Sequence, residues 1–285
     1  MKKIKVLALC AIVAGFATSC QKDDIANETA PEVASVELSK EHQLAVAAAG
    51  VNPFDAIYKT VNYPDGTSKK GILAGTKGFQ DIFIALDDLA NQALNGDLKQ
   101  YRTNALVSQG RTIRVVGYTG NGFALTSRMR TGLQWAVNNY NRINTSLTFT
   151  LSFAATTNGD MIVYNAGGSG AGGQAEFPSG GRPGKFIQIL GGMANQNNNV
   201  NEHVIGHEMG HALGFRHTDY AQRRCDGSNE GTAGSIGAVH IPGTPTANRW
   251  GQAGLDSGSL MISCFDGSED GEFSAADIRA LEFLY

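Results

Sequence analysis

The stretch from His207 to His217 reads HEMGHALGFRH and contains three of the six histidines in this 285-residue chain. His207 and His211 are four residues apart, so on a helix they lie one turn apart on the same face and can bind one metal ion. Glu208 is rotated by about 100° from His207 on such a helix, which directs its carboxylate beside the ion. There it can take a proton from a bound water. This spacing predicts a hydrolytic metal site.

A third ligand is expected after a turn that ends the helix. Gly214 can adopt a positive φ, so the chain can reverse and bring His217 back toward the ion. Three neutral imidazoles leave one coordination position of a zinc ion open, as in catalytic rather than structural sites. The pattern therefore predicts one catalytic Zn ion bound by His207, His211 and His217, with Glu208 as general base. The competing explanation is a helix with incidental surface histidines.

Two further residues near the motif have no clear spacing argument. His203 lies one helical turn before His207, and we expect it to stay outside the ligand set because a catalytic zinc needs a free position. Asp219 is a candidate for orienting a ligand.

The elements that must position these residues follow from the apolar periodicity. Strand patterns occupy 112–118, 147–153, 161–166 and 185–190, and helical patterns occupy 78–94, 124–143 and 199–215. Strand, helix and three further strands before a helix predict a mixed α/β layer fold. The Gly-rich segment 167–184 contains G-x-G-x-x-G, but no helix opens after it, which argues against nucleotide binding. We expect an irregular sheet edge there, to which an extended peptide can add as a strand.

Several stretches together resemble a known family. HExxHxxGxxH is the zinc signature of the metzincins, and GHEMGHALGFRHTD resembles the bacterial dual-action HEIGH metallopeptidases, with Met209 where Ile is usual. IPGTP (241–245), SLM (259–261) and the closing FSAADIRALEFLY (273–285) belong to the same resemblance, which covers about residue 110 to the end.

The resemblance implies an α+β, metzincin-like (zincin) fold. Its parts would be a mixed twisted sheet with long helices, an active-site helix and a Met-turn, preceded by a small N-terminal segment. It implies a zinc-dependent endopeptidase, a hydrolase of peptide bonds, with Met261 as the Met-turn residue beneath the metal. Some metzincins have a Tyr two residues after this Met, and here that position is Ser263.

The N-terminus, MKKIKVLALCAIVAGFATSC, predicts export. Three lysines precede an apolar run that is too short to span a bilayer, so residues 1–19 are expected to be a lipoprotein signal peptide. The ATSC sequence resembles a bacterial lipobox, in which Cys20 becomes the lipid-modified first residue, and QKDD resembles a signal for the outer cell surface. We therefore expect a monomeric outer-membrane or cell-surface lipoprotein that contacts the membrane only through this lipid. An ordinary secreted protein is the alternative.

The remaining chain is predicted to divide into three parts. Residues 20–40 are polar and acidic and form a tether, 41–110 form an N-terminal segment or prosegment, and 111–285 form the catalytic domain. Cys225 and Cys264 are expected to form a disulfide in an oxidising compartment, with a free buried pair as the alternative. No cysteine lies between Cys20 and Cys225, so latency imposed by 41–110 would need a carboxylate or a backbone group.

A second metal ion is also considered. DGSEDGEFSAAD, residues 266–277, resembles an EF-hand-type calcium loop, with candidate Ca ligands at Asp266, Ser268, Asp270 and Asp277. Its twelfth residue is Asp rather than Glu, and no helix clearly precedes it. The alternative is a polar loop in which Ser274 caps the last helix and Asp277 completes a capping box.

The net charge and its distribution limit the classes of binding partner. The net charge is −3 without a basic stripe, so no nucleic acid is expected, and the partner is a peptide or protein substrate. Two other functions stay open. One is a cell-surface binding or adhesion lipoprotein with a catalytically silent zinc site, and the other is a zinc hydrolase acting on a non-peptide amide.

Overall fold

The part of the chain after residue 110 builds its elements where the apolar periodicity predicts them. The computed structural model describes residues 37–285 apart from 77–78, 93–101, 104, 226 and 228–237. The predicted signal peptide, Cys20 and most of the predicted tether lie outside the described residues. The elements are β4 (Thr112–Tyr118), α2 (Ser127–Arg142), β5 (Thr148–Ala154), β6 (Met161–Gly167), β8 (Phe186–Leu190) and α3 (Asn198–Leu213). Each agrees with its predicted span to within about three residues.

One mixed sheet of eight strands organises the described residues, in the order β1-β2-β3-β7-β8-β6-β4-β5. β4 pairs in parallel with both β5 and β6, and β6 pairs in parallel with β8. β7 (Gly173–Glu176) is antiparallel to β8. This mixed sheet with few helices confirms the predicted α+β class.

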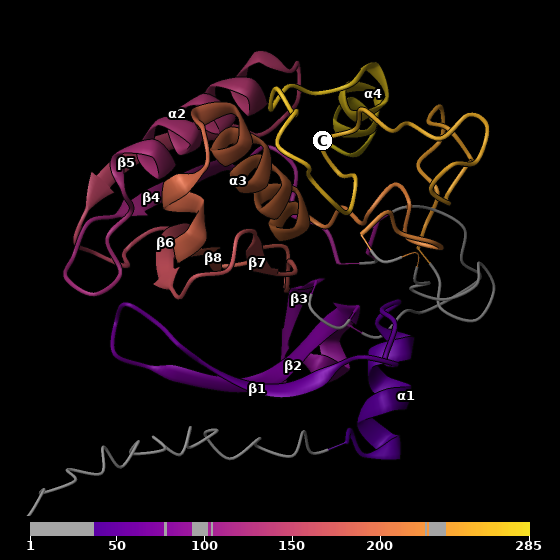
Figure 1. Cartoon of the computed structure of the whole chain (residues 1–285), viewed down its shortest axis with the longest axis horizontal. Coiled ribbons are helices and arrows are strands. Elements are labelled where there is room, and N and C mark those ends of the chain that lie inside the picture. The colour runs from indigo at the N-terminus through magenta and orange to yellow at the C-terminus, as the bar shows by residue number, and fades with distance from the viewer. Residues whose placement is uncertain (1–36, 77–78, 93–101, 104, 226, 228–237) are drawn as a thin grey trace, which may run out of the picture. The chain divides into compact units, whose positions relative to one another are not determined.

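Helices α2 and α3 lie beside each other on one face of the sheet (Figure 1). The short 3-10 helix η2 (Gly191–Asn195) precedes α3, and α4 (Ala275–Leu284) ends the chain. The main hydrophobic core lies between these helices and the sheet, and its buried members run from Val107 to Tyr285. Within the described chain, no helix has the length and apolar character needed to cross a bilayer.

The N-terminal segment adds three strands to this sheet. It contains α1 (Lys40–Ala48), β1 (Ile57–Asn62), β2 (Ser68–Thr76), β3 (Phe79–Ala85) and the 3-10 helix η1 (Leu89–Gln92). β1, β2 and β3 form an antiparallel meander. A second core joins α1 to β2 and β3, and all its buried members except Phe177 come from 38–89.

The helix predicted over 78–94 is wrong, because this stretch forms β3 and η1. Ile82 belongs to the second core, whereas its neighbour Phe83 belongs to a third cluster with Ile162 and Phe186. A strand that is buried on both faces has a continuous apolar run rather than an alternating one, and periodicity does not separate such a run from a helix.

The Gly-rich segment also differs from its prediction. Its Gly173–Glu176 part is strand β7, which lies inside the sheet rather than at its edge. β3 pairs with it in parallel, with Ile82 opposite Ala175 and Phe83 opposite Glu176. The position expected for an added strand is therefore filled by a strand of the same chain.

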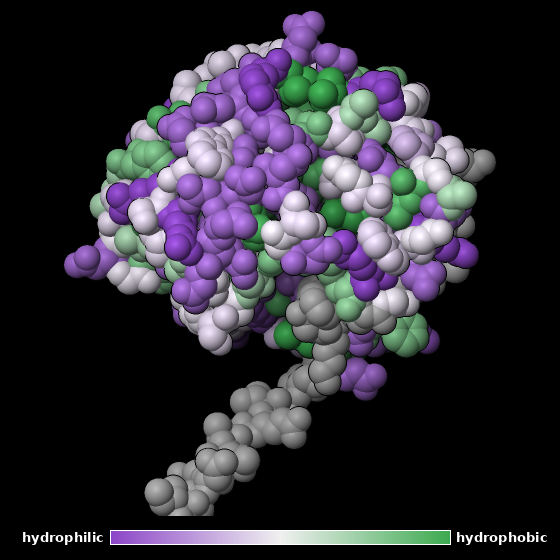
Figure 2. Space-filling view, turned by 45° about the horizontal axis from the view of Figure 1, so that its top comes forward, coloured by the Kyte–Doolittle hydropathy of each residue, from purple (hydrophilic) through white to green (hydrophobic). Residues whose placement is uncertain are grey.

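The face of the molecule shown in Figure 2 is largely polar. In the view of Figure 2, hydrophilic residues dominate and apolar residues appear in small separate groups. The large apolar side chains that are exposed come from scattered positions: Leu44, Phe54, Trp135, Phe153, Trp250 and Phe283. Exposed apolar residues that are scattered in this way are normal for a globular protein.

Candidate metal centre

Helix α3 supplies two of the three histidines and is enclosed by the protein. Its N-cap residue Asn197 accepts a hydrogen bond from the Val200 amide at 2.9 Å, and every residue from Val200 to Leu213 is buried. The helix ends at Gly214, whose φ of 110° is left-handed, and the Phe215 amide bonds the Gly210 carbonyl at 3.0 Å. This Schellman-type end reverses the chain and carries His217 back, as the position of Gly214 predicts.

The three imidazoles of the motif converge. Their ring centroids lie 4.6 Å apart for His207 and His211, 4.8 Å for His211 and His217, and 5.2 Å for His207 and His217. His207 Nδ1 donates to the Leu260 carbonyl at 2.8 Å, and His211 Nδ1 donates to the Phe215 carbonyl at 2.8 Å. These bonds place the proton on Nδ1 of both rings, so each Nε2 presents a lone pair.

The donor set fits a divalent cation. His211 Nε2 lies 3.1 Å from His217 Nε2, which in turn lies 2.9 Å from Asp81 Oδ2. Nitrogen and oxygen atoms with lone pairs repel one another at these distances. One proton can form a hydrogen bond between His211 and His217 or between His217 and Asp81, but not in both pairs. Burial lowers the pKa of His211 to about 3 and also holds the pKa of His207 and His217 below the usual value, which favours the neutral form of each ring. Neutral imidazoles with free Nε2 atoms are the form that binds zinc.

Met261 packs against α3 at Gly210, in the turn that carries His207 and His211. It is buried, and a Cβ built at Gly210 would overlap its sulfur. Its neighbour Leu260 supplies the carbonyl that holds His207. The SLM segment therefore contacts both the helix and His207, which is the place that the resemblance implies for a Met-turn.

Asp219 ties the segment after His217 to the same turn. The Ser263 amide donates to Asp219 Oδ1 at 3.0 Å and the Ser263 hydroxyl donates to Oδ2 at 2.7 Å. The Thr218 amide bonds the Met261 carbonyl at 2.9 Å. Ser263, which stands where some metzincins have a Tyr, thus holds the buried carboxylate of Asp219 and through it the segment that follows His217.

Glu208 lies beside the imidazoles and faces a cavity. A cavity of about 280 Å³ is lined by Glu208, His207 and His203, together with Gly172, Gly173 and Phe265 among others. The strand β7 passes close by, because a Cβ at Gly173 would lie 2.5 Å from Glu208 Cγ. Glu208 Oε2 has no hydrogen-bond partner among the described residues. Burial and the nearby Asp81 raise the pKa of Glu208 well above its usual value, and a cation at the three imidazoles would oppose that rise.

Asp81 was not predicted as a site residue. It lies on β3, it is buried, and one of its oxygens belongs with His207, His211 and His217 to a group whose ligand atoms lie within 4.8 Å of one another. Arg223 Nη2 lies 3.7 Å from Asp81 Oδ1. Burial by itself would raise the pKa of Asp81, but His217 and Arg223 outweigh it and hold the pKa below the usual value. More than 120 residues separate Asp81 from the motif, so no spacing in the sequence indicates this contact.

The other histidines near the motif stay outside the ligand group. His203 is buried in the cavity wall with its ring centroid 6.2 Å from that of His207, and burial lowers its pKa to about 4. His240 Nε2 bonds the Thr244 carbonyl at 2.9 Å.

In the predicted calcium loop, Asp277 forms the capping box. Ser259 Oγ donates to Asp277 Oδ1 at 2.6 Å, and the amides of Leu260 and Ser274 donate to Oδ2 at 2.7 and 3.0 Å. Ser274 caps α4 in return. The nearby Asp266 Oδ1 accepts from the amide and hydroxyl of Ser268, and Asp270 Oδ1 accepts from the Glu272 amide. The calcium site stays a prediction that a calcium titration of the chelated protein would test.

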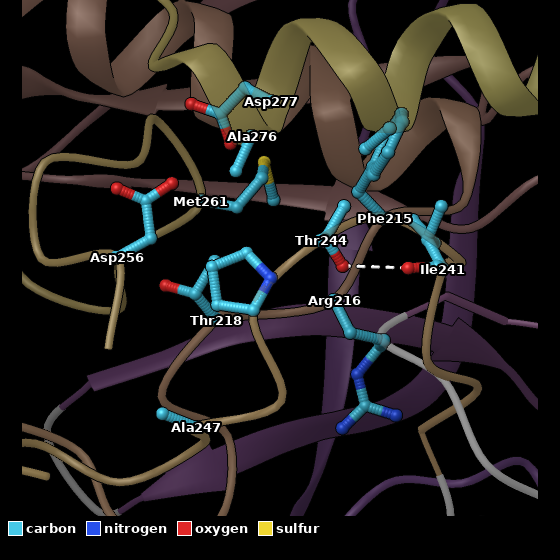
Figure 3. A pocket seen from close by; sticks show the side chains of 12 residues that line it. Phe215, Arg216, Thr218, Ile241, Thr244, Ala247, Asp256, Met261, Ala276 and Asp277 are labelled. Carbon is cyan, nitrogen blue, oxygen red and sulfur yellow. Dashed lines mark hydrogen bonds between the residues drawn. The ribbon is translucent and has the colours of Figure 1, made fainter. Parts of the chain in front are cut away.

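The two remaining cysteines and a small second cavity complete the surroundings. Cys225 and Cys264 form a disulfide, with Cα atoms 5.6 Å apart, that joins the region after Asp219 to the segment after Met261. A cavity of about 30 Å³ lies beside Met261, with Phe215, Ile241 and Asp277 among its lining residues (Figure 3). It has room for about one water molecule and no catalytic side chain among those drawn.

Known proteins resemble this chain to different degrees. Two solved structures of myroilysin match at 14% and 15% identity, covering 61% and 62% of this chain and 80% and 83% of the other, each with a TM-score of 0.39. No curated protein matches the sequence. The family described as dual-action HEIGH metallo-peptidases matches residues 80–285, a range that includes the three histidines, Glu208, Met261 and also Asp81. The chain therefore belongs to this family and is a zinc metallopeptidase.

Proposed function

We propose that the protein is an endopeptidase in which His207, His211 and His217 hold the zinc ion and Glu208 is the general base. The observation that carries the proposal is the position of Glu208. Its carboxylate is buried, lines the same cavity as His207, and has an oxygen without a partner among the described residues. A carboxylate in this position can exchange protons with a reacting water and a leaving group.

The chemistry divides between the ion and the chain. Zinc, when bound, supplies Lewis acidity toward the scissile carbonyl and lowers the pKa of water. Glu208 takes one proton from the attacking water as its oxygen bonds to the carbonyl carbon. Glu208 then passes this proton to the amide nitrogen as the carbon–nitrogen bond breaks, so one water is consumed for each peptide bond. Leu260 and Phe215, through their carbonyls, keep the imidazoles oriented throughout.

A substrate would be recognised as an extended chain. The backbone of β7 runs beside Glu208, and strand addition to such a segment uses main-chain hydrogen bonds that every peptide offers. The cavity wall provides apolar surface from Leu190, Val204 and Ile262, which favours apolar side chains near the cleaved bond. Both features support a protein or peptide substrate.

We also infer that the protein is exported and anchored by a lipid on Cys20. The disulfide between Cys225 and Cys264 supports this inference, because disulfides persist in oxidising compartments. Intact-mass analysis of the mature protein tests it. A chain that begins at Cys20 with the added mass of acyl groups is expected, and an unmodified N-terminus would leave the secreted alternative.

The test of the peptidase proposal compares four zinc-loaded proteins on a mixture of unstructured peptides. Because Asp81 lies against the ligands, wild type and Asp81→Ala are each measured with and without Glu208→Gln. Cleavage is expected in at least one form that retains Glu208. It should vanish with a chelator and fall by roughly 10²–10⁴-fold on Glu208→Gln. If no form cleaves any peptide, the proposal is wrong, and binding without cleavage would favour the adhesion alternative.

A further inference from the structure

We propose that the N-terminal segment is an intramolecular inhibitor, in which β3 fills the substrate position along β7 and Asp81 is the fourth ligand of the metal. The inference rests on the proposed function and adds its regulation. It makes the described chain a latent form, which becomes active when β3 leaves the site.

Asp81 supplies the group that closes the metal site. Three histidines leave a catalytic zinc one open position, whereas a fourth protein ligand is typical of a closed structural site. Asp81 Oδ2 lies 2.9 Å from His217 Nε2, and the Asp81 side chain is 12% exposed. An oxygen donor at this place is one that zinc accepts. With Asp81 bound, no position is left for water or for a substrate carbonyl.

β3 occupies the place that an extended substrate would need. On its other side, β7 is already paired with β8, so β3 takes the free edge of β7. Gly173, at the start of β7, lies against Glu208. A peptide that reaches Glu208 along this edge must therefore displace β3. Asp81 therefore blocks the metal position, and β3 blocks the edge of β7 that leads to it.

The hairpin β1–β2 holds β3 in this position through contacts to β7. Tyr63 donates a hydrogen bond to Glu176 Oε1 at 2.6 Å, and its ring stacks on Phe186 with centroids 3.9 Å apart. Lys59 Nζ donates to Gln174 Oε1 at 3.0 Å. Gln174 and Glu176 are the two polar residues of β7, and both are engaged by the N-terminal segment.

The segment can leave without dismantling the core around the histidines. Among the described residues, the main core begins at Leu106 and Val107, and it packs α2, α3 and α4 against the sheet. The second core is built from 38–89 except for Phe177. The two parts share the smaller cluster that contains Tyr63, Phe83 and Phe186. An inhibitor with a core of its own can separate from β7 without unpacking α2, α3 and α4.

The first experiment tests Asp81 with a probe of the metal position. Zinc-loaded full-length wild type, Asp81→Ala and Asp81→Asn are titrated calorimetrically with acetohydroxamate, and Asp87→Ala serves as the control, since Asp87 is exposed and lies two residues beyond β3. Asp81→Asn preserves the shape if Asp81→Ala does not fold. Both Asp81 variants should bind the probe at least tenfold more tightly than wild type, and Asp87→Ala should match wild type.

The outcomes separate this inference from the proposed function. Equal probe affinity in wild type and the Asp81 variants would overturn the role of Asp81. Tight probe binding by the Asp81 variants with no peptide cleaved by any form would contradict the peptidase and leave this inference standing. If wild type and the Asp81 variants cleave peptides at the same rate and bind the probe with the same affinity, the peptidase proposal stands and this inference is wrong.

A second experiment tests the strand. Hydrogen exchange of the β3 amides is compared among wild type, Tyr63→Phe and Tyr58→Phe. Tyr58 is the matched control because its hydroxyl bonds Ser39 and His42 rather than β7. Exchange over 79–85 should accelerate about tenfold in Tyr63→Phe and stay near wild type in Tyr58→Phe. Equal exchange in all three would contradict the role of the hairpin in holding β3.

Discussion

Two glycines one turn apart on α3 allow the packing of Met261 beneath the histidines to be measured. A Cβ at Gly210 would overlap Met261 Sδ and lie 3.2 Å from its Cε. A Cβ at Gly206 would meet Leu260 Cδ2 at 3.2 Å and Ala136 Cβ at 3.7 Å. Gly206→Ala is therefore a matched control for Gly210→Ala, with the same chemical change in the same helix.

The magnitude follows from two opposing contributions to the free energy of unfolding. Replacing Gly by Ala in a helix interior stabilises by about 1 kcal/mol at either position. Overlap with Met261 costs about 1–3 kcal/mol at position 210, whereas the Leu260 methyl can rotate away at position 206. Gly210→Ala should therefore be about 2 kcal/mol less stable than Gly206→Ala.

A displaced Met261 should also weaken the metal site. The carbonyl of Leu260 accepts the bond from His207 Nδ1, so movement of this turn changes the orientation of a ligand. Loss of such a supporting contact typically lowers zinc affinity by about 10–100-fold. Gly210→Ala should show this loss in a chelator competition, and Gly206→Ala should not.

The assay is urea unfolding of the chelated proteins, repeated in a Met261→Ala background. Without the Met261 side chain the overlap disappears, so Gly210→Ala should stabilise the helix as Gly206→Ala does. The two substitutions should then change the free energy of unfolding by the same amount. If Gly210→Ala is as stable as Gly206→Ala in the wild-type background, Met261 does not pack as described and the reasoning fails.

Three further predictions concern the surroundings of the site. Asp219→Ala should lower zinc affinity about 10–100-fold in a chelator competition, and Ser263→Ala less, because Asp219 anchors the segment after His217; an unchanged affinity in both would argue against that role. Replacing Cys225 and Cys264 together by Ser should destabilise the protein by about 4 kcal/mol in urea unfolding, since the disulfide closes a loop of about 40 residues; no change would mean that the bond does not form. Burial raises the pKa of Glu202 to about 7 from its usual 4.5, so the folded state binds this proton more tightly and its stability falls as pH rises from about 4.5 to 7. Glu202→Gln should flatten that decline in the chelated protein, and an equal slope in both proteins would contradict the raised pKa.

The elements after residue 110 could be predicted because each is specified locally. Helix α3 is identified by two histidines at a four-residue spacing and by Gly214, whose left-handed conformation ends it. These are interactions within one or two turns, where the geometry of a helix determines which side chains meet. The set of candidate ligands and the candidate general base therefore came from the sequence by itself.

The tertiary structure decided what closes the site. Asp81 reaches the histidines because β3 adds to β7, and both strands were misjudged: β3 as a helix, since it is buried on both faces, and β7 as a free edge. The bonds between Asp219 and Ser263, and between Leu260 and His207, likewise join residues more than 40 positions apart. Such pairs depend on how strands and turns pack, and local spacing carries no information about that. The sequence by itself determined the chemistry of the site, whereas the pairing of one strand decided whether that chemistry is accessible.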